Sequence, residues 1–441
     1  MAKSSSKKIS TDPYKGVRDF FPEDMAIEKE VFAIWRSAVE KYGYQEYGAS
    51  VLEPSDLYKA KTGDEIVNEQ TYTFIDRGER EVTLRPEMTP TVARMIAAKR
   101  RELVAPIRWY SIPNLFRYEQ PQGGRVREHW QLNVDIFGVD SIHAEVEVMS
   151  IAYDIMRGYG LKDTDFEIRI NNRKVVNYIL KDVFGLDDTA SHTLGKLIDK
   201  KDKLEKKAFE QGVTDIFTKV KKEAHIAAFL TLLNSKNFEE FTSHLPQTKE
   251  EHVGLTEIRA TIRGLEELGI TNVRFDQTLM RGFDYYTGIV FEVYDMNPAN
   301  RRSVFGGGRY DELLSLFGND KMTAVGFGAG DVIARDIMET YKTLPATTSA
   351  VDLGILIVGD HNSPYALELA RNLRGKGLNI FVDFSGKKLG DQISNAGKRK
   401  IPRIICIGDE EVKTGKLRVK NLAKGEEIVT DEAGIPGLVR A

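Results

Sequence analysis

The pattern of apolar and polar positions divides the chain into regions of different character. From Gly16 to about residue 170, helix-like stretches alternate with runs typical of antiparallel strands. Residues 171–256 have few strand signals and are rich in lysine-bearing helical segments, such as Lys196–Phe209 and Val220–Leu233. Strand patterning resumes at Val273 and continues through Val293, and it is followed by glycine-rich turns at Gly306 and a helix from about Asp331 to Tyr341. The pattern therefore predicts a strand-and-helix domain that is interrupted by a helical insertion.

A further domain follows a linker rich in threonine, serine and proline. It alternates strands and helices in the order Leu353–Val358, Ser363–Lys376, Asn379–Phe384, Lys388–Lys398 and Arg403–Ile407. Such alternation is typical of α/β domains. The expected organisation is a disordered tail over 1–15, a first domain in two parts over 16–170 and 257–342, an insertion over 171–256, a linker over 343–350 and a last domain over 351–441.

One segment combines an arginine, an acid and two phenols directly before a strand: Arg281-Gly282-Phe283-Asp284-Tyr285-Tyr286. Arg281 stays protonated, and its planar fork suits a phosphate or another oxyanion. The acid and the phenols can read hydrogen-bonding groups on a small ligand. The spacing leaves open the alternative that an Arg281–Asp284 pair closes a surface turn.

A second polar group stands where a strand-like run from Tyr72 meets a proline. Arg85 and Glu87 flank this proline, and Thr89 comes just before a helical pattern over residues 91–99. The break between strand and helix thus carries both an acid and an arginine.

A third segment reads as strand, loop and strand. It begins at Phe116–Glu119, continues through a basic, glycine-bearing loop and ends in the strand pattern Trp130–Gly138. Gln131, Asn133 and Asp135 alternate on one face of this otherwise apolar strand. Polar groups in such a strand are costly unless they have binding partners, so a binding site is predicted here.

These segments resemble the histidyl-tRNA synthetases, which are class II aminoacyl-tRNA synthetases. Arg281–Tyr286 and Gly306–Asp311 are similar to the two signatures of that family, and Phe116–Glu119 resembles class II motif 2. The helix-like Glu23–Tyr42, followed by Tyr47–Pro54, resembles motif 1, which builds the dimer interface in the family. The resemblance extends from Gly16 to the C-terminus.

The resemblance implies an α/β protein whose α+β catalytic domain has a class II antiparallel sheet flanked by helices, with a helical insertion and a C-terminal α/β anticodon-binding domain. It implies that L-histidine is activated with ATP and transferred to the 3′ end of tRNA(His) by a homodimer. Mg²⁺ accompanies ATP, and no tightly bound cofactor is expected. The alternatives are a non-catalytic regulatory subunit, like that of ATP phosphoribosyltransferase, or an RNA-sensing module.

Roles carry over position by position. Activation builds negative charge on phosphate oxygens, and the family positions that neutralise it correspond to Arg117 and Arg281. Histidine binding is implied for Glu87, Thr89, Gln131, Asp135, Tyr285 and Tyr286. ATP binding is implied for Arg117, Glu119, Arg125 and Arg309.

Three positions depart from the family pattern. Phe283 replaces a leucine of the signature, and Asp135 stands where glutamate is common. Class II motif 3 usually ends in an arginine that stacks on adenine, whereas this chain has Ile333 there. Arg335 lies two residues later, about 200° around a helix, and should point elsewhere. Arg309 is therefore a candidate to compensate as a cation near the triphosphate.

Composition narrows the remaining choices. The formal net charge is −3, so a nucleic acid has to be held by local patches. The only cysteine, Cys406, excludes an internal disulfide framework and fits a reducing compartment. No apolar run approaches the ~20 residues of a membrane span, and residues 1–10 lack the apolar core of a signal peptide. We therefore expect a cytoplasmic protein without a membrane partner.

The charge of the last domain and of the loop in motif 2 leaves alternatives open. Residues 351–441 contain 15 basic and 12 acidic residues. Lys387-Lys388 and Lys398-Arg399-Lys400 are concentrated at helix ends, where they suit phosphate contacts or simply a solvated surface. For Arg127, a surface hairpin and a contact with RNA are both possible. The seven histidines show no paired spacing of metal ligands, so no metal site is expected.

Overall fold

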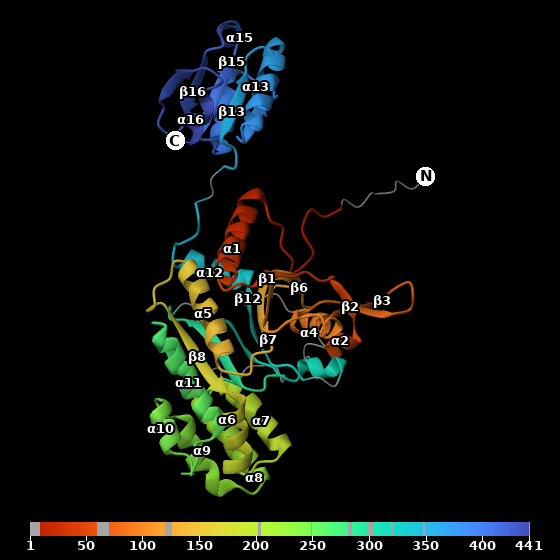
Figure 1. Cartoon of the computed structure of the whole chain (residues 1–441), viewed down its shortest axis with the longest axis vertical. Coiled ribbons are helices and arrows are strands. Elements are labelled where there is room, and N and C mark those ends of the chain that lie inside the picture. Colours follow the sequence, from red (N-terminus) through yellow and green to blue (C-terminus); the bar gives the residue numbers. More distant parts are fainter. Residues whose placement is uncertain are drawn as a thin grey trace, which may run out of the picture. The chain divides into compact units, whose positions relative to one another are not determined.

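The computed structural model describes residues 9–59, 70–119, 126–201, 204–247, 249–280, 285–298, 303–318, 321–346 and 349–440. The chain forms two compact units, Met1–Pro345 and Ala346–Ala441 (Figure 1). In the described part of the chain, none of the helices has both the length and the apolar content that crossing a membrane requires.

The first unit is built on a nine-stranded sheet. Its strand order is β1 (Gln45–Glu46), β5 (Ile107–Ser111), β7 (Glu128–Phe137), β12 (Ala324–Gly330), β11 (Ser303–Arg309), β10 (Ile289–Asp295), β8 (Phe166–Asn172) and β9 (Val273–Phe275), and β6 (Asn114–Phe116) also pairs with β7. All neighbours from β5 to β8 are antiparallel, whereas β1 and β9 pair in parallel at the edges. The expectation of a largely antiparallel sheet is confirmed.

Helices from distant parts of the chain cover one face of this sheet: α1 (Pro22–Glu40), α5 (His143–Gly158), α11 (Val253–Glu267) and α12 (Asp331–Thr340). Their apolar side chains share one core with Leu132, Val134 and Ile136 of β7. The opposite face packs against α4 (Thr89–Ala98) and the 3₁₀ turn Leu313–Phe317. The alternation of β7 thus places the apolar residues under the helices and leaves Gln131, Asn133 and Asp135 on the other face.

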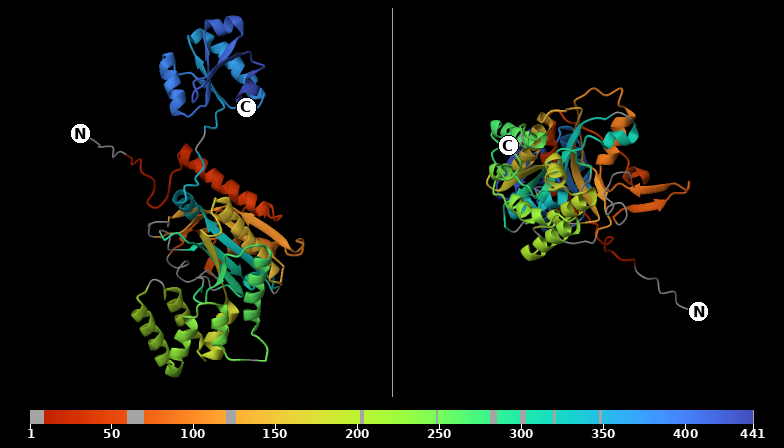
Figure 2. Two further views of the ribbon diagram at one scale, coloured as in Figure 1. Left: turned by 90° about the vertical axis from the view of Figure 1, so that its left-hand side faces the viewer. Right: turned by 90° about the horizontal axis from the view of Figure 1, so that it is seen from below.

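A smaller three-stranded sheet has the order β2 (Leu52–Pro54), β4 (Glu81–Leu84) and β3 (Tyr72–Ile75), beside α2 (Asp56–Lys59). The β3–β4 hairpin projects from the body of the unit (Figure 2). The segment Tyr47–Pro54, which resembles part of motif 1, contains β2, and β2 pairs with β4 in this small sheet.

The insertion contains α6 (Arg173–Asn177), a π-helical turn Tyr178–Val183, α7 (Asp188–Asp199), α8 (Lys206–Lys219), α9 (Ile226–Leu233) and α10 (Phe238–Ser243). These helices gather at one end of the first unit (Figure 1). The predicted helix Lys196–Phe209 is wrong, since it crosses the break between α7 and α8. The physical reason is that the lysine-rich stretch between Ile198 and Phe209 offers almost no apolar side chain to the core, whereas both of those residues are buried.

The prediction of turns rich in glycine around Gly306 is also wrong, because Gly306–Gly308 lie within the central strand β11. A Cβ on Gly306 would lie 2.3 Å from the Phe291 carbonyl oxygen, and one on Gly307 only 1.9 Å from that of Gly326. The glycines are needed here for the close approach of neighbouring strands rather than for a reversal of the chain.

The second unit contains a five-stranded sheet with the order β14 (Ile380–Asp383), β13 (Leu353–Ile357), β15 (Arg403–Ile407), β16 (Leu417–Asn421) and β17 (Glu427–Thr430). The first three strands are parallel, and the last two are added antiparallel. Its helices are α13 (Ser363–Gly375), α14 (Leu389–Lys398), α15 (Asp409–Thr414) and α16 (Ile435–Arg440). The predicted order of strands and helices from Leu353 to Ile407 is confirmed.

Candidate active site

A row of residues that includes two glycines crosses the face of the main sheet away from the four helices. Five residues form one row across neighbouring strands, in the order Trp109, Asp135, Gly326, Gly308 and Val290. Residues directly opposite each other in antiparallel strands point to the same face. A Cβ on Gly326 would lie 2.1 Å from Asp135 Oδ1, and one on Gly308 would lie 2.9 Å from Tyr286 Cδ1. The glycines therefore make the room in which Asp135 and Tyr286 lie.

Gln131 lies on the same face of β7, two alternate positions from Asp135. A Cβ on Gly328 would lie 2.5 Å from Gln131 Nε2, so a side chain at this position would clash with Gln131. We call Gly308, Gly326 and Gly328 the glycine floor. Asn133 Nδ2 donates to the Gln131 carbonyl at 3.0 Å and steadies the strand rather than facing a ligand. At Gly330, where β12 ends, a Cβ would meet no atom within 4 Å, so the floor opens there into free space.

Asp135 is paired with a residue that the sequence did not single out. The Tyr310 hydroxyl, immediately after β11, donates a hydrogen bond to the Asp135 carboxylate, and both side chains are buried. Burial raises the pKa of Asp135 to about 7, against the opposing effect of the hydrogen bond from Tyr310. Burial and the charge of Asp135 raise the pKa of Tyr310 well above its usual value. The position of Tyr310 inside the Gly306–Asp311 signature was the only signal for it in the sequence.

The two tyrosines of the signature lie next to this pair. The ring centroid of Tyr285 is 4.9 Å from that of Tyr286 and 5.8 Å from that of Tyr310. All three share an apolar cluster with Val290. Arg281 and Asp284, the charged members of the signature, lie outside the described residues, as does Arg125.

The segments that carry Glu87 and Arg117 are joined to each other. Arg117 Nε donates to the Pro86 carbonyl at 2.9 Å, beside the buried Glu87, and Thr89 opens α4. Arg85 belongs to the framework instead, because its guanidinium donates to Asn114 and to the backbone carbonyls of residues 49 and 50. Glu87, Thr89 and Arg117 thus come from one corner of the unit.

His129 lies two residues before Gln131 on β7, so the two side chains point to the same face. Burial, together with the charges of Arg117 and Arg18, lowers its pKa to about 3. His129 is therefore a neutral imidazole close to Arg117. The sequence pointed only to a structural or surface role for it.

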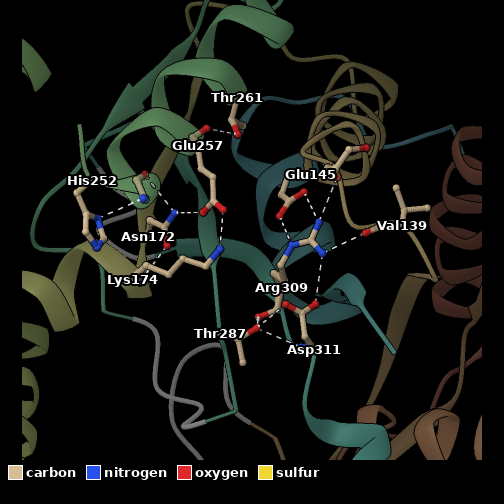
Figure 3. A network of polar contacts seen from close by, with 12 residues as sticks. Val139, Glu145, Asn172, Lys174, His252, Glu257, Thr261, Thr287, Arg309 and Asp311 are labelled. Carbon is tan, nitrogen blue, oxygen red and sulfur yellow. Dashed lines mark hydrogen bonds and ion pairs between the residues drawn. The ribbon is translucent and has the colours of Figure 1, made fainter. Parts of the chain in front are cut away.

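Arg309 points toward Glu145 on α5 (Figure 3). Its Nε and Nη2 donate to the two carboxylate oxygens of Glu145 at 2.6 and 2.7 Å, and its remaining bonds go to Asp311 and the carbonyls of Val139 and Ser141. These bonds use all five N–H donors of a guanidinium, and Arg309 is only 6% exposed. The geometry argues against the predicted contact with ATP, because no donor of Arg309 faces a ligand.

One further arginine, Arg127, is held within the protein. Arg127 is buried, stacks on Tyr118 and donates to the Tyr14 hydroxyl at 2.9 Å, so neither a surface hairpin nor an exposed RNA contact describes it. Tyr14, which was expected in a disordered tail, therefore contacts Arg127 through both its hydroxyl and its ring. The carbonyl of Glu119 accepts from Arg127 Nε at 3.2 Å.

Ile333 and Arg335, the two motif 3 positions on α12, point in different directions, as expected for residues two positions apart on a helix. Arg335 points to α1, where it pairs with Asp24 at 3.0 Å, and it also pairs with Glu339. Ile333 packs against the main core. Over the described residues, no group of three or more His, Cys, Asp or Glu side chains is placed to hold a metal ion.

A largely antiparallel sheet with helices on one face, followed by a separate α/β unit, is the architecture of the class II aminoacyl-tRNA synthetases. Residues 16–330 match the family model of histidyl-tRNA synthetase, and residues 352–440 match that of an anticodon binding domain. The chain belongs to the histidyl-tRNA synthetase family.

Similarity to individual members extends over nearly the whole chain. The histidine–tRNA ligase of Leptospira biflexa serovar Patoc is 41% identical over 420 residues, which cover 95% of this chain and 94% of the relative. That of Halobacterium salinarum is 34% identical, with 97% of each chain covered. The crystal structure of histidyl-tRNA synthetase from Nostoc sp. PCC 7120 superposes with a TM-score of 0.82 at 22% identity, over 98% of this chain and 99% of the other.

Proposed function

We propose that this chain is a histidine–tRNA ligase. It activates L-histidine with ATP to form histidyl-adenylate and pyrophosphate, and it then transfers histidine to the 3′ end of tRNA(His). The observation that carries the proposal is the buried Asp135–Tyr310 pair over the glycine floor, in a chain that matches the family over residues 16–330 and 352–440.

The pocket suits an imidazole because it offers a buried acceptor beside phenols. A neutral imidazole carries one N–H donor and one acceptor nitrogen. In the proposed complex the Asp135 carboxylate accepts from the N–H, and the Tyr286 hydroxyl donates to the other nitrogen. A side chain that lacks either group leaves a buried polar atom unpaired, which discriminates strongly against it. Tyr285 packs against both phenols that line this side.

The amino-acid end lies toward the corner that carries Glu87. The buried Glu87 carboxylate binds the α-ammonium group, supported by Thr89 and Gln131. This arrangement directs the substrate carboxylate toward Arg117, whose guanidinium is anchored on the Pro86 carbonyl.

In the first step an oxygen of the histidine carboxylate attacks the α-phosphorus of ATP. The new P–O bond forms as the bond to pyrophosphate breaks, and negative charge grows on the phosphate oxygens. Arg117 and Arg281 neutralise that charge. ATP is held by Arg117, Glu119 and Arg125, and Mg²⁺ would accompany it as part of the substrate and neutralise charge on its phosphates. In the second step a hydroxyl of the terminal ribose of tRNA attacks the carbonyl carbon, and AMP leaves.

We also propose a homodimer, formed through the motif 1 segment, and a cytoplasmic location. The single cysteine, Cys406, supports a reducing compartment. The alternative, a regulatory or RNA-sensing protein without catalysis, keeps the fold but has no need of the substrate contacts.

The test is pyrophosphate exchange with each of the twenty amino acids, using the full chain, ATP and Mg²⁺ without tRNA. We expect exchange with histidine alone. Asp135→Ala should raise the KM for histidine far more than that for ATP, whereas Asp163→Ala, an exposed control, should change neither. Exchange with no amino acid would contradict the proposal and favour the non-catalytic alternative.

A further inference from the structure

An aromatic side chain stands exposed at the carboxyl edge of the parallel strands in the second unit. Phe384 directly follows β14 and is 65% exposed, more than any other large apolar side chain described in this unit. Val358, which directly follows the neighbouring β13, is 41% exposed. In open sheets of this kind, ligands bind outside the carboxyl ends of the parallel strands. A single exposed apolar residue is ordinary on a protein surface. A binding role for Phe384 therefore also depends on how its loop is held and on which charges lie beside it.

The loop that presents Phe384 is held by buried polar groups. Asp383, which is 5% exposed, accepts from the Ser385 N–H at 2.7 Å. Gln392 on α14 is 1% exposed, and its Nε2 donates to the carbonyls of Lys387 at 2.8 Å and Ile357 at 2.9 Å. Its Oε1 accepts from the Ile357 N–H at 3.1 Å. One buried amide thus ties the loop to the end of β13, so that little freedom is left to lose when a ligand binds.

The same loop carries positive charge that is not used within the protein. Lys387 and Lys388 are exposed, and neither forms an ion pair among the described residues. The second basic cluster, Lys398-Arg399-Lys400, lies at the other end of α14, about 15 Å away along a helix of this length. Arg399 also packs over the Phe381 ring at 4.8 Å. Only the first cluster accompanies Phe384.

We propose that Phe384 is a stacking platform for one unpaired base of the tRNA anticodon loop, with Lys387 and Lys388 holding the adjoining phosphates. An exposed ring on an anchored loop, beside cations, suits single-stranded nucleic acid, because every base has a face to stack and every linkage carries a charge. A protein partner has no equal need of the two lysines. The inference rests on the proposed function and assigns residues to its RNA-binding part.

The first experiment measures histidylation of two RNAs, a full tRNA(His) transcript and an acceptor-stem minihelix without the anticodon arm. Phe384→Ala should lower kcat/KM for the full transcript by roughly 5- to 150-fold, mainly through KM, the range expected for one lost base stack. It should leave the minihelix unchanged. Phe384→Trp, which keeps a stacking face, should stay within about twofold of the unaltered chain.

The controls separate stacking from general surface effects. Val429→Ala removes an apolar side chain that is 58% exposed on β17 of the same unit, and it should change neither RNA. The double change Lys387→Ala with Lys388→Ala should weaken binding of the full transcript and reduce the slope of log affinity against log salt by about 2. Pyrophosphate exchange without tRNA should be the same for all these proteins.

Two results would overturn the proposal. The first is that Phe384→Ala lowers kcat/KM equally for the transcript and the minihelix. The second is that this variant keeps full activity on the transcript, which would favour a protein partner for the ring. If the unaltered chain shows no histidine-dependent exchange, the proposed catalytic function fails instead. The platform is then tested by binding of an isolated anticodon stem-loop RNA. Binding that Phe384→Ala weakens supports it, and equal binding by both proteins refutes it.

Discussion

Arg309, in the second family signature, either stabilises the fold or binds ATP, and a substitution at this position tells the two roles apart. Its guanidinium forms a bidentate pair with Glu145, which is 2% exposed, and satisfies two backbone carbonyls (Figure 3). Arg309→Met fills much of the same space but leaves the Glu145 carboxylate buried without its cation. Removing one partner of a buried ion pair costs about 3–5 kcal/mol of folding free energy. We expect a loss of that size.

The chain offers a specific probe for this loss. All three tryptophans, Trp35, Trp109 and Trp130, belong to the first unit, so tryptophan fluorescence during urea unfolding reports on that unit alone. Arg263→Met is the matched control, because Arg263 pairs with Glu267 on the surface of α11, where the arginine is 79% exposed. Such an exposed pair contributes at most about 0.5 kcal/mol. Combining Arg309→Met with Glu145→Gln should recover part of the lost stability, since the buried charge is then gone.

The opposite pattern would refute this reasoning. If Arg309 binds ATP, Arg309→Met should unfold at the same urea concentration as the unaltered chain and show a KM for ATP raised at least about tenfold, the loss of one charge-assisted contact. A stability change without a rise in that KM supports the structural role.

Three further predictions concern pH and packing. Because burial raises the pKa of Asp135 to about 7, its carboxylate is lost below that pH, and kcat/KM for histidine should fall on acidification; Asp135→Asn should lower activity and remove this dependence, apart from the titration of the substrate itself. Glu28, buried on α1, has a pKa raised to about 8 by burial and by the charge of Asp331. Stability from its neutral form is therefore lost as pH rises from about 4.5 to 8, and Glu28→Gln should unfold with a smaller decline than the unaltered chain over that range. Gly326→Ala places a methyl group 2.1 Å from Asp135 Oδ1 and displaces the carboxylate. The KM for histidine should therefore rise by up to about 100-fold. An unchanged KM would show that histidine binding does not need this carboxylate.

The local pattern of apolar residues was sufficient to predict a helix or strand wherever that element is determined by its own residues. The period of apolar positions predicted α1 and α12 and the alternating order from Leu353 to Ile407. It failed at Lys196–Phe209, because lysines suit both a helix and the connection between two helices, and only the apolar residues that reach the core decide where each helix stops.

The identity of the chemistry was likewise present in the sequence, through residues such as Glu87, Arg117 and Asp135 in recognisable segments. What each group does depends on its neighbours in space. Tyr310 and Asp135 are 175 positions apart and meet only because β11, β12 and β7 are adjacent. Arg309, one residue before Tyr310, points instead to Glu145.

The sequence by itself determined the fold class, the family and the residue types available for catalysis, because helix and strand periods and short motifs are local properties. The tertiary structure decided that Gly308 and Gly326 leave room for Tyr286 and Asp135, that Tyr310 pairs with Asp135 and that Arg309 pairs with Glu145. Strand pairing across long separations is set by packing of the whole sheet, and no local period records which distant strand will be the neighbour.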